Sequence, residues 1–227
     1  MARRRLLTGD ERRRLFDPPV QETAIIGHYT LSAEDVELVG RRYGPANRLG
    51  LAAQIALMRH PGFGLQPEIG LPDVILQYLA AQLFVDPSSF SAYGQRAQTR
   101  TDHADLVARY LGIRPFRRGD LALALNLAAQ AAEYTDRGEP IVRALMVGLK
   151  GERFILPSGD TLERAGLAGR ARARKAAAAA IVEGLSSAEL TRLDELVINN
   201  PDFGMTPLAW LRNFEEAPTA ANINGLL

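Results

Sequence analysis

Helix signals follow one another along almost the whole of this 227-residue chain, whereas the alternation of apolar and polar residues that marks strands is scarce. Thr8 with Glu11 and Ser186 with Glu189 have the spacing of capping boxes, in which a hydroxyl and a carboxylate bind the first free backbone amides of a helix. After Pro72, apolar residues recur every three or four positions, as on one face of a helix. The sequence therefore predicts an all-α, multi-helical fold.

Caps, glycines and prolines also predict where these helices begin and end. The pair Gly44-Pro45 separates two amphipathic segments, so a helix-turn-helix-like element is expected there. The expected helices cover approximately residues 12–16, 32–42, 46–59, 72–83, a short one after Pro87, 98–111, 120–134, 140–151, 161–183, 187–197 and one from 206 that holds Trp210.

Two helical subdomains are expected, with a boundary at the segment 155–158, which contains Pro157. The first is an N-terminal helical DNA-binding domain over residues 1–156, and the second a DNA-binding subdomain over 157–227. A last helix near Thr219 ends without a closing element, so we expect the second subdomain to be truncated at its C-terminus.

Several classes of site and location are disfavoured by the residues themselves. There is no cysteine, no phosphate-binding GxxxxGK[ST] loop and no GxSxG motif, and His28, His60 and His103 are far apart in sequence. Carboxylates lie on expected helix faces, with no strands to gather them around metal ions. The chain also lacks an apolar run long enough for a membrane span or signal peptide. We expect a cytoplasmic protein without a catalytic or metal site of its own.

The basic charge is uneven and consists almost entirely of arginine. Residues 1–182 hold 25 Lys and Arg against 19 Asp and Glu, whereas residues 183–227 hold 2 against 7. Only 2 of the 27 basic residues are lysine. A GC-rich genome would favour arginine codons, but arginine is also the residue that forms two parallel hydrogen bonds to a phosphate or to the edge of a guanine. Composition leaves both explanations open.

The segment 41–48 is the strongest local candidate for DNA contact. Arginines end one expected helix and begin the next, so they converge on one edge of the turn. Asn47 suits adenine and Arg48 suits guanine or phosphate if the second of these helices enters a major groove. An ordinary helical hairpin, whose arginines compensate a helix dipole, is the alternative. The candidate residues of this segment are Arg41, Arg42, Asn47 and Arg48.

A second candidate surface lies between residues 96 and 118, where six arginines stand against Asp102 and Asp105. Its donors suit phosphate contacts, although a solvated charged face would have the same composition. A third basic run, 170–175, spreads its charges around a helix. The candidates are Arg96, Arg100, Arg114, Arg117 and Arg118 from the second surface and Arg172 from the third run.

Longer blocks of sequence resemble a known family. They include His28-Tyr29-Thr30-Leu31-Ser32, the segment from Arg41 to Ala52, Arg59-His60-Pro61-Gly62, and Tyr110-Leu111-Gly112 followed by Arg114-Pro115-Phe116. In this order they resemble the N-terminal region of the TnpA transposases of class II replicative transposons, the Tn-three family. Ile155-Leu156-Pro157 and Leu208-Ala209-Trp210-Leu211-Arg212 extend the resemblance over almost the whole chain.

This resemblance implies a helical region that binds the terminal inverted repeats of the transposon. It also implies that DNA is cut and joined by an Asp-Asp-Glu site with divalent metal far downstream, so no cofactor is expected in this chain. The expected partners are double-stranded DNA, the remainder of the transposase and a second copy held through regions outside this chain; no membrane is expected. The alternative is a helical protein-interaction or regulatory module that does not contact DNA directly.

Overall fold

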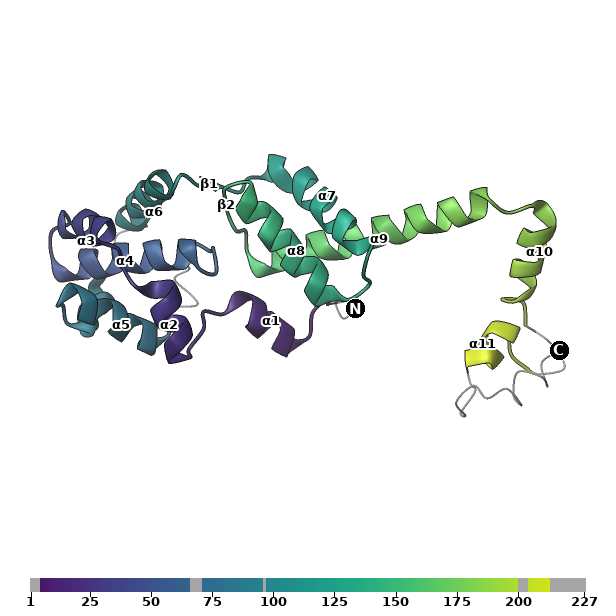
Figure 1. The fold of residues 1–227 in the computed structure, drawn as a ribbon, viewed down its shortest axis with the longest axis horizontal. Coiled ribbons are helices and arrows are strands. Elements are labelled where there is room, and N and C mark those ends of the chain that lie inside the picture. Colours follow the sequence, from purple (N-terminus) through teal and green to yellow (C-terminus); the bar gives the residue numbers. More distant parts are fainter. Residues whose placement is uncertain (1–4, 66–70, 96, 200–203, 213–227) are drawn as a thin grey trace. The chain divides into compact units, whose positions relative to one another are not determined.

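The computed structural model describes residues 5–65, 71–95, 97–199 and 204–212, and helices dominate this part of the chain (Figure 1). The chain divides into two compact units, Met1–Arg174 and Lys175–Leu227. Within the described residues, the named strands are β1 (Arg114–Pro115) and β2 (Phe154–Ile155), a parallel pair of two residues each. The predicted all-α, multi-helical fold is therefore confirmed.

The first unit contains α1 (Gly9–Phe16), α2 (Glu22–Tyr29), α3 (Ala33–Gly40), α4 (Pro45–Arg59), α5 (Asp73–Leu83), the 3-10 helix η1 (Pro87–Ala92), α6 (Ala97–Leu111), the 3-10 helix η2 (Arg118–Asp120), α7 (Leu121–Ala132) and α8 (Gly138–Gly151). Helix α9 (Gly159–Glu183) continues past the end of this unit, and the second unit adds α10 (Ser187–Glu195) and α11 (Pro207–Arg212).

Local capping fixes the first residue of several helices. The Thr8 hydroxyl accepts from the Glu11 amide at 3.2 Å, and the Glu11 carboxylate accepts from the Thr8 amide at 2.7 Å. The same reciprocal bonds join Ser186 to Glu189 at the start of α10. Each cap satisfies amides that would otherwise have no partner in the first turn. The two capping boxes expected from the sequence are thus confirmed.

Helix α4 is the central element of one group of helices, α2 to α6. Every residue from Leu49 to Met58 is buried, which is possible because α2 and α5 cover one side of the helix and α3 and α6 another. Gly50 allows an especially close approach, since a Cβ atom there would lie 2.1 Å from the ring of Tyr93. Burial of this length makes α4 a core helix, with its first turn as the accessible part.

A second group of helices, α1, α7, α8 and the first half of α9, surrounds its own apolar core. Ile141, Leu145 and Leu149 of α8 are fully buried there beside Leu162 of α9. Two contacts connect this core to the loop after α4: the Leu156 amide donates to the Gly62 carbonyl at 2.8 Å, and Phe63 belongs to the same cluster. Both groups therefore belong to one unit.

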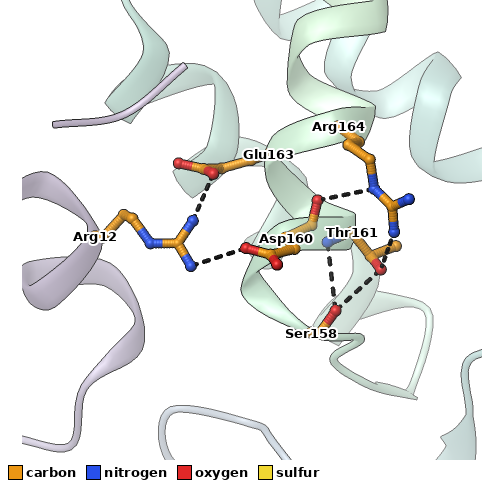
Figure 2. A network of polar contacts seen from close by, with 6 residues as sticks. All are labelled: Arg12, Ser158, Asp160, Thr161, Glu163 and Arg164. Atoms are coloured by element: carbon orange, nitrogen blue, oxygen red, sulfur yellow. Dashed lines mark hydrogen bonds and ion pairs between the residues drawn. The ribbon is translucent and has the colours of Figure 1, made fainter. Parts of the chain in front are cut away.

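Helix α1 is attached to the start of α9 by one guanidinium group (Figure 2). Arg12 donates to Glu163 at 2.5 Å and to Asp160 at 3.0 Å. Glu163 is 6% exposed, so the pair is partly shielded from solvent. Ser158 and Thr161 bond to each other across the first turn of α9, at 3.0 Å between their hydroxyl oxygens. Arg12 therefore has a structural role, because it holds α1 against α9.

The boundary expected near Pro157 stays a prediction. In the structure, α9 begins two residues after Pro157, its first half packs into the first unit, and the division falls between Arg174 and Lys175. In the second unit, the Leu208 amide donates to the Leu196 carbonyl at 3.1 Å. The expected helix near Thr219 lies outside the described residues.

No helix in the described part of the chain is both long and apolar enough to cross a bilayer.

Candidate nucleic-acid interface

The arginines fall into two groups, according to whether a carboxylate of the same chain already neutralises them. A surface arginine that pairs with an internal carboxylate has less charge to offer a phosphate. The arginines that form ion pairs in the described residues are Arg12, Arg13, Arg14, Arg41, Arg59, Arg114, Arg143 and Arg174. Among the described residues, no ion pair is made by the predicted contacts Arg42, Arg48, Arg100, Arg117, Arg118 and Arg172.

The turn between α3 and α4 has the expected helix–turn–helix form. Gly44 has a φ of +80°, in the region that favours glycine, and Pro45 begins α4 with the fixed φ of a first helical residue. Arg41 pairs with Glu37 one turn earlier, at 2.6 Å. Arg48 is exposed and donates from Nε to the Arg42 carbonyl at 3.0 Å. The turn therefore presents guanidinium groups from both of its helices.

Asn47 is only half-buried, but its amide already has a local role. Its Nδ2 donates to the Tyr43 carbonyl at 3.0 Å, which satisfies a backbone acceptor of the turn. Since α4 is buried from Leu49 onward, the helix cannot lie lengthwise in a groove, and base contact is confined to its first turn.

The start of α6 lies beside this turn. Tyr93 accepts from Gln54 of α4 at 2.9 Å and bonds to His103 Nδ1 at 3.1 Å. Burial lowers the pKa of His103, and the nearby charge of Arg42 lowers it further, although Asp102 opposes this. The Arg42 guanidinium thus acts on a side chain of α6. The structure brings the two segments together although they lie more than fifty residues apart in sequence.

Arg100 lies in the first turn of α6, and its guanidinium is held by the backbone. Its Nη1 donates to the Gly94 carbonyl, and its own carbonyl accepts from Gln54 Nε2 at 2.9 Å. Arg96 lies outside the described residues. We call the set Arg41, Arg42, Arg48 and Arg100 the first arginine cluster.

A second set of arginines surrounds the β1–β2 pair. The Arg114 guanidinium stacks over the Phe154 ring with its central carbon 3.7 Å from the ring centroid, and Nη1 lies 3.4 Å from Asp120. The Arg114 amide donates to the Arg153 carbonyl at 2.8 Å, so Arg153 is its neighbour across the strand pair. Arg117 lies beside Arg114 and helps to line a concavity of about 440 Å³. Asp120 also lines this concavity, so one of its two arginines is already paired and Arg117 is the one that can meet an anion.

Two residues of this second set were missed by sequence reasoning. Arg109 is exposed in the last turn of α6, just before β1, and Arg153 is exposed at a φ of +62°, unusual for a residue with a Cβ atom. Only the strand pairing connects Arg153 with Arg114. We call the set Arg109, Arg114, Arg117, Arg118 and Arg153 the second arginine cluster.

The two clusters lie at opposite ends of α6. This helix has 15 residues, so its ends are about 22 Å apart at a rise of about 1.5 Å per residue. Asp102 and Asp105 are exposed between them. Along α6 the charge is therefore basic near both ends and acidic between, which suits contact with an anionic polymer at two points.

Arg172 lies apart from both clusters. It is exposed on α9 and donates to Asn126 of α7 at 2.7 Å. Two residues to either side of it, Arg170 donates to the Asp136 carbonyl and Arg174 to the Asp136 carboxylate. These contacts attach α9 to the loop between α7 and α8.

A larger cleft of about 510 Å³ lies between α1, the loop after α4 and the start of α9. Phe16 and Phe63 meet there edge to face, with their ring centroids 5.9 Å apart. Of its three arginines, Arg12 and Arg13 already pair with carboxylates. The cleft therefore offers little net positive charge.

Two histidines that are far apart in sequence meet in the structure. The rings of His28 and His60 stack with centroids 3.7 Å apart. Burial lowers the pKa of His60 to about 4, and the charges of His28 and Lys150 act in the same direction. Throughout the described ranges, no three His, Cys, Asp or Glu side chains come together in a way that could hold a metal ion.

Residues 6–168 match a family model described as "Domain of unknown function (DUF4158)". The transposase for transposon Tn501 of Pseudomonas aeruginosa is 34% identical over 227 residues, which are 100% of this chain and 23% of that protein. The transposase for Tn21 of Escherichia coli is 34% identical over 224 residues, or 98% of this chain and 23% of the relative. The transposase for Tn1546 of Enterococcus faecium is 28% identical over 211 residues, 92% and 21% respectively. The chain spans less than a quarter of the length of these relatives.

Proposed function

Because the chain belongs to the DUF4158 family and corresponds to the N-terminal part of transposases, we propose that it binds the double-stranded DNA of a transposon's terminal inverted repeats. The observation that best supports this proposal is the pair of arginine clusters at the two ends of α6. Most of these side chains lack a carboxylate partner among the described residues. Phosphates of a duplex would supply the missing negative charge.

The two clusters would act mainly on the sugar–phosphate backbone. Phosphate contacts fix the register and orientation of a protein on DNA, and arginine can donate two parallel bonds to one phosphate. Arg117 and Arg118 are exposed at the second cluster, and Arg42 and Arg48 lie at the first. The acidic residues between the clusters would keep the middle of α6 away from the duplex.

Base recognition would come from the first turn of α4. Arg48 can donate to guanine, and Asn47 can pair with adenine once its Nδ2 leaves the Tyr43 carbonyl. That exchange replaces one hydrogen bond by another, so its cost is small. In this proposal Arg41, Arg100, Arg114 and Arg172 contribute as phosphate contacts where their internal bonds allow.

The chemistry of transposition would be carried by other parts of the protein. We assign DNA cleavage and strand transfer, with the divalent metal that they need, to the part of the relatives that this chain does not cover. The remainder of the transposase is then the second partner, and a homodimer would form through those further regions. The cytoplasm is the expected location, where the DNA is accessible.

A gel-shift assay with the chain tests the proposal directly. Duplexes that carry the terminal repeats of the transposon should be shifted at lower protein concentrations than scrambled duplexes of equal length. If both duplexes are bound equally and the binding weakens with salt, the chain binds DNA but does not recognise the terminal repeats. If neither is bound, a protein-interaction module becomes the better function.

A further inference from the structure

Tyr43 stands in the turn between α3 and α4 with 94% of its surface exposed. Among the residues that the structure describes, two other aromatic residues are comparably exposed, Phe84 at 96% and Tyr134 at 90%. A single exposed aromatic residue is common and needs no partner. Tyr43 differs from the other two in its surroundings.

Arginines surround Tyr43, whereas acidic residues accompany the other two rings. Arg41 and Arg42 precede Tyr43 directly, and Arg48 is bonded to the same turn. Phe84 is instead followed by Asp86, and Tyr134 follows Glu133. Of these three rings, only Tyr43 lies within one of the two arginine clusters.

The turn that carries Tyr43 is held in one conformation. The Tyr43 carbonyl accepts from Asn47, and the next residue, Gly44, takes up the left-handed backbone angle. On the other side, the Nε atom of Arg42 is buried and has no hydrogen-bond partner among the described residues. The Arg42 side chain is thus packed against the protein, close to His103. The backbone of the turn therefore loses little conformational entropy when the ring contacts a ligand.

We propose that Tyr43 stacks on a nucleobase whose face is exposed in the bound DNA. The inference rests on the proposed function, because it assumes that the first arginine cluster lies against the sugar–phosphate backbone. An exposed aromatic ring on a fixed turn, with arginines beside it in the chain, suits a base, since every base offers a flat face while the cations can hold the adjacent phosphates. In a continuous duplex each base face is covered by its neighbours, so the contact favours an unpaired or unstacked position.

Fluorescence anisotropy with two probes of random sequence tests this inference. One probe is a continuous 24-base-pair duplex, and the other carries three unpaired thymines at its centre. The wild-type chain should bind the second probe about tenfold more tightly, because one stacked base contributes on this scale. Tyr43→Ala should bind both probes alike, while Tyr43→Phe, which keeps the ring, should retain the preference. Tyr134→Ala is the matched control and should behave like the wild type.

The outcomes separate this inference from the proposed function. If Tyr43→Ala keeps the preference for unpaired bases, or the wild type has none, the assignment of Tyr43 is overturned and DNA binding stands. If the wild type binds neither probe at low salt, DNA binding fails, and the inference fails with it. Since the side chain is exposed, the thermal unfolding midpoint of Tyr43→Ala should equal that of the wild type, so misfolding does not confuse the result.

Discussion

Arg59 donates from both terminal nitrogens to the two carboxylate oxygens of Asp35, at 2.5 and 2.6 Å. Asp35 is fully buried, and it also accepts from the Ser32 amide at 2.8 Å and from the Tyr110 hydroxyl at 2.8 Å. One carboxylate therefore joins α3, α4 and α6. These are the helices that carry the first arginine cluster.

Asp35→Asn should destabilise the protein strongly. It removes the negative charge but leaves the Arg59 guanidinium partly buried, and loss of one member of a buried pair costs about 3–5 kcal/mol. Urea unfolding followed by circular dichroism measures the change. Glu37→Gln is the matched control, because it breaks the exposed pair with Arg41, a change of about 0.5 kcal/mol or less. Equal midpoints for the two variants would contradict the assignment.

The same carboxylate should make stability depend on acid. Burial raises the pKa of Asp35, but the hydrogen bonds from Arg59, Ser32 and Tyr110 and the charge of Arg59 outweigh it, so the net pKa is lowered. The stabilisation is therefore complete above the unfolded pKa of about 3.9 and is lost as pH falls through the folded pKa. Between about pH 5 and pH 3, Asp35→Asn should show a flatter stability profile than the wild type. If the stability of the wild type and that of Asp35→Asn fell in parallel with pH, the lowered pKa of Asp35 would be wrong.

A pair of glycine substitutions tests the packing around α4. Gly50→Ala places a methyl group 2.1 Å from the Tyr93 ring and should cost about 1–3 kcal/mol through overpacking. Gly27→Ala, in α2, meets no atom within 4 Å and should stabilise the protein by about 0.5–1 kcal/mol, because alanine is the better helix former. Thermal unfolding of both variants measures the difference. If Gly50→Ala were also stabilising, the close contact with Tyr93 would be wrong.

The salt dependence of DNA binding should report the number of phosphates contacted. Seven arginines of the two clusters make no ion pair with a described residue: Arg42, Arg48, Arg100, Arg109, Arg117, Arg118 and Arg153. With five or six contacts made, log affinity should fall against log salt with a slope near about −5. Arg117→Ala should weaken binding to specific and scrambled duplexes alike and flatten the slope by about one unit.

Arg143→Ala is the control for this titration. Arg143 is exposed but already pairs with Glu139, at 2.7 Å, and belongs to neither cluster, so its slope should match that of the wild type. Removal of the acidic segment from residue 183 onward should likewise leave the slope unchanged. If binding does not vary with salt, the clusters are not phosphate contacts.

Asn47→Ala and Arg48→Ala should affect specificity more than overall affinity. If the first turn of α4 reads bases, each variant should lose about 1–3 kcal/mol on terminal-repeat DNA and much less on scrambled DNA. Competition anisotropy with the two duplexes measures the ratio. Uniform weakening on both would identify these residues as backbone contacts.

No DNA cleavage or strand transfer is expected from this chain with magnesium or manganese. The proposal assigns that chemistry to the part of the relatives beyond the match. Supercoiled plasmid bearing the transposon ends should remain intact after incubation. Nicking that increases with protein concentration and persists through purification would contradict the assignment.

Local features of the fold could be predicted from sequence, because the residues that create them are neighbours. The capping boxes at Thr8 and Ser186 and the Gly44–Pro45 break depend on spacings of a few residues. Helix α2 was missed. Its N-cap, Gln21, makes no side-chain cap, and the helix is instead fixed by the packing of Ile25 and Tyr29 against α4 and α5. Tertiary contacts decide such a helix.

Parts of the candidate interface could not be predicted, because they depend on contacts between distant residues. No local pattern indicates that Arg153 lies beside Arg114, since a two-residue strand leaves no alternation to detect. The pairing of Arg41 with Glu37 was readable at helical spacing, but the burial of α4 was not. The sequence therefore shows where the arginines lie along the chain. Which of them are exposed and unpaired, and so able to contact DNA, depends on the fold.

The alanine run of α9 has a mechanical consequence. Ala176–Ala180 are all exposed and begin two residues after the end of the first unit, so this stretch is helical without a core to pack against. Alanine is the strongest helix former, so the intrinsic helix propensity of these five residues keeps this part of α9 helical. Replacing them with glycine would remove this intrinsic preference and loosen the helix at these residues, without touching the core of the first unit.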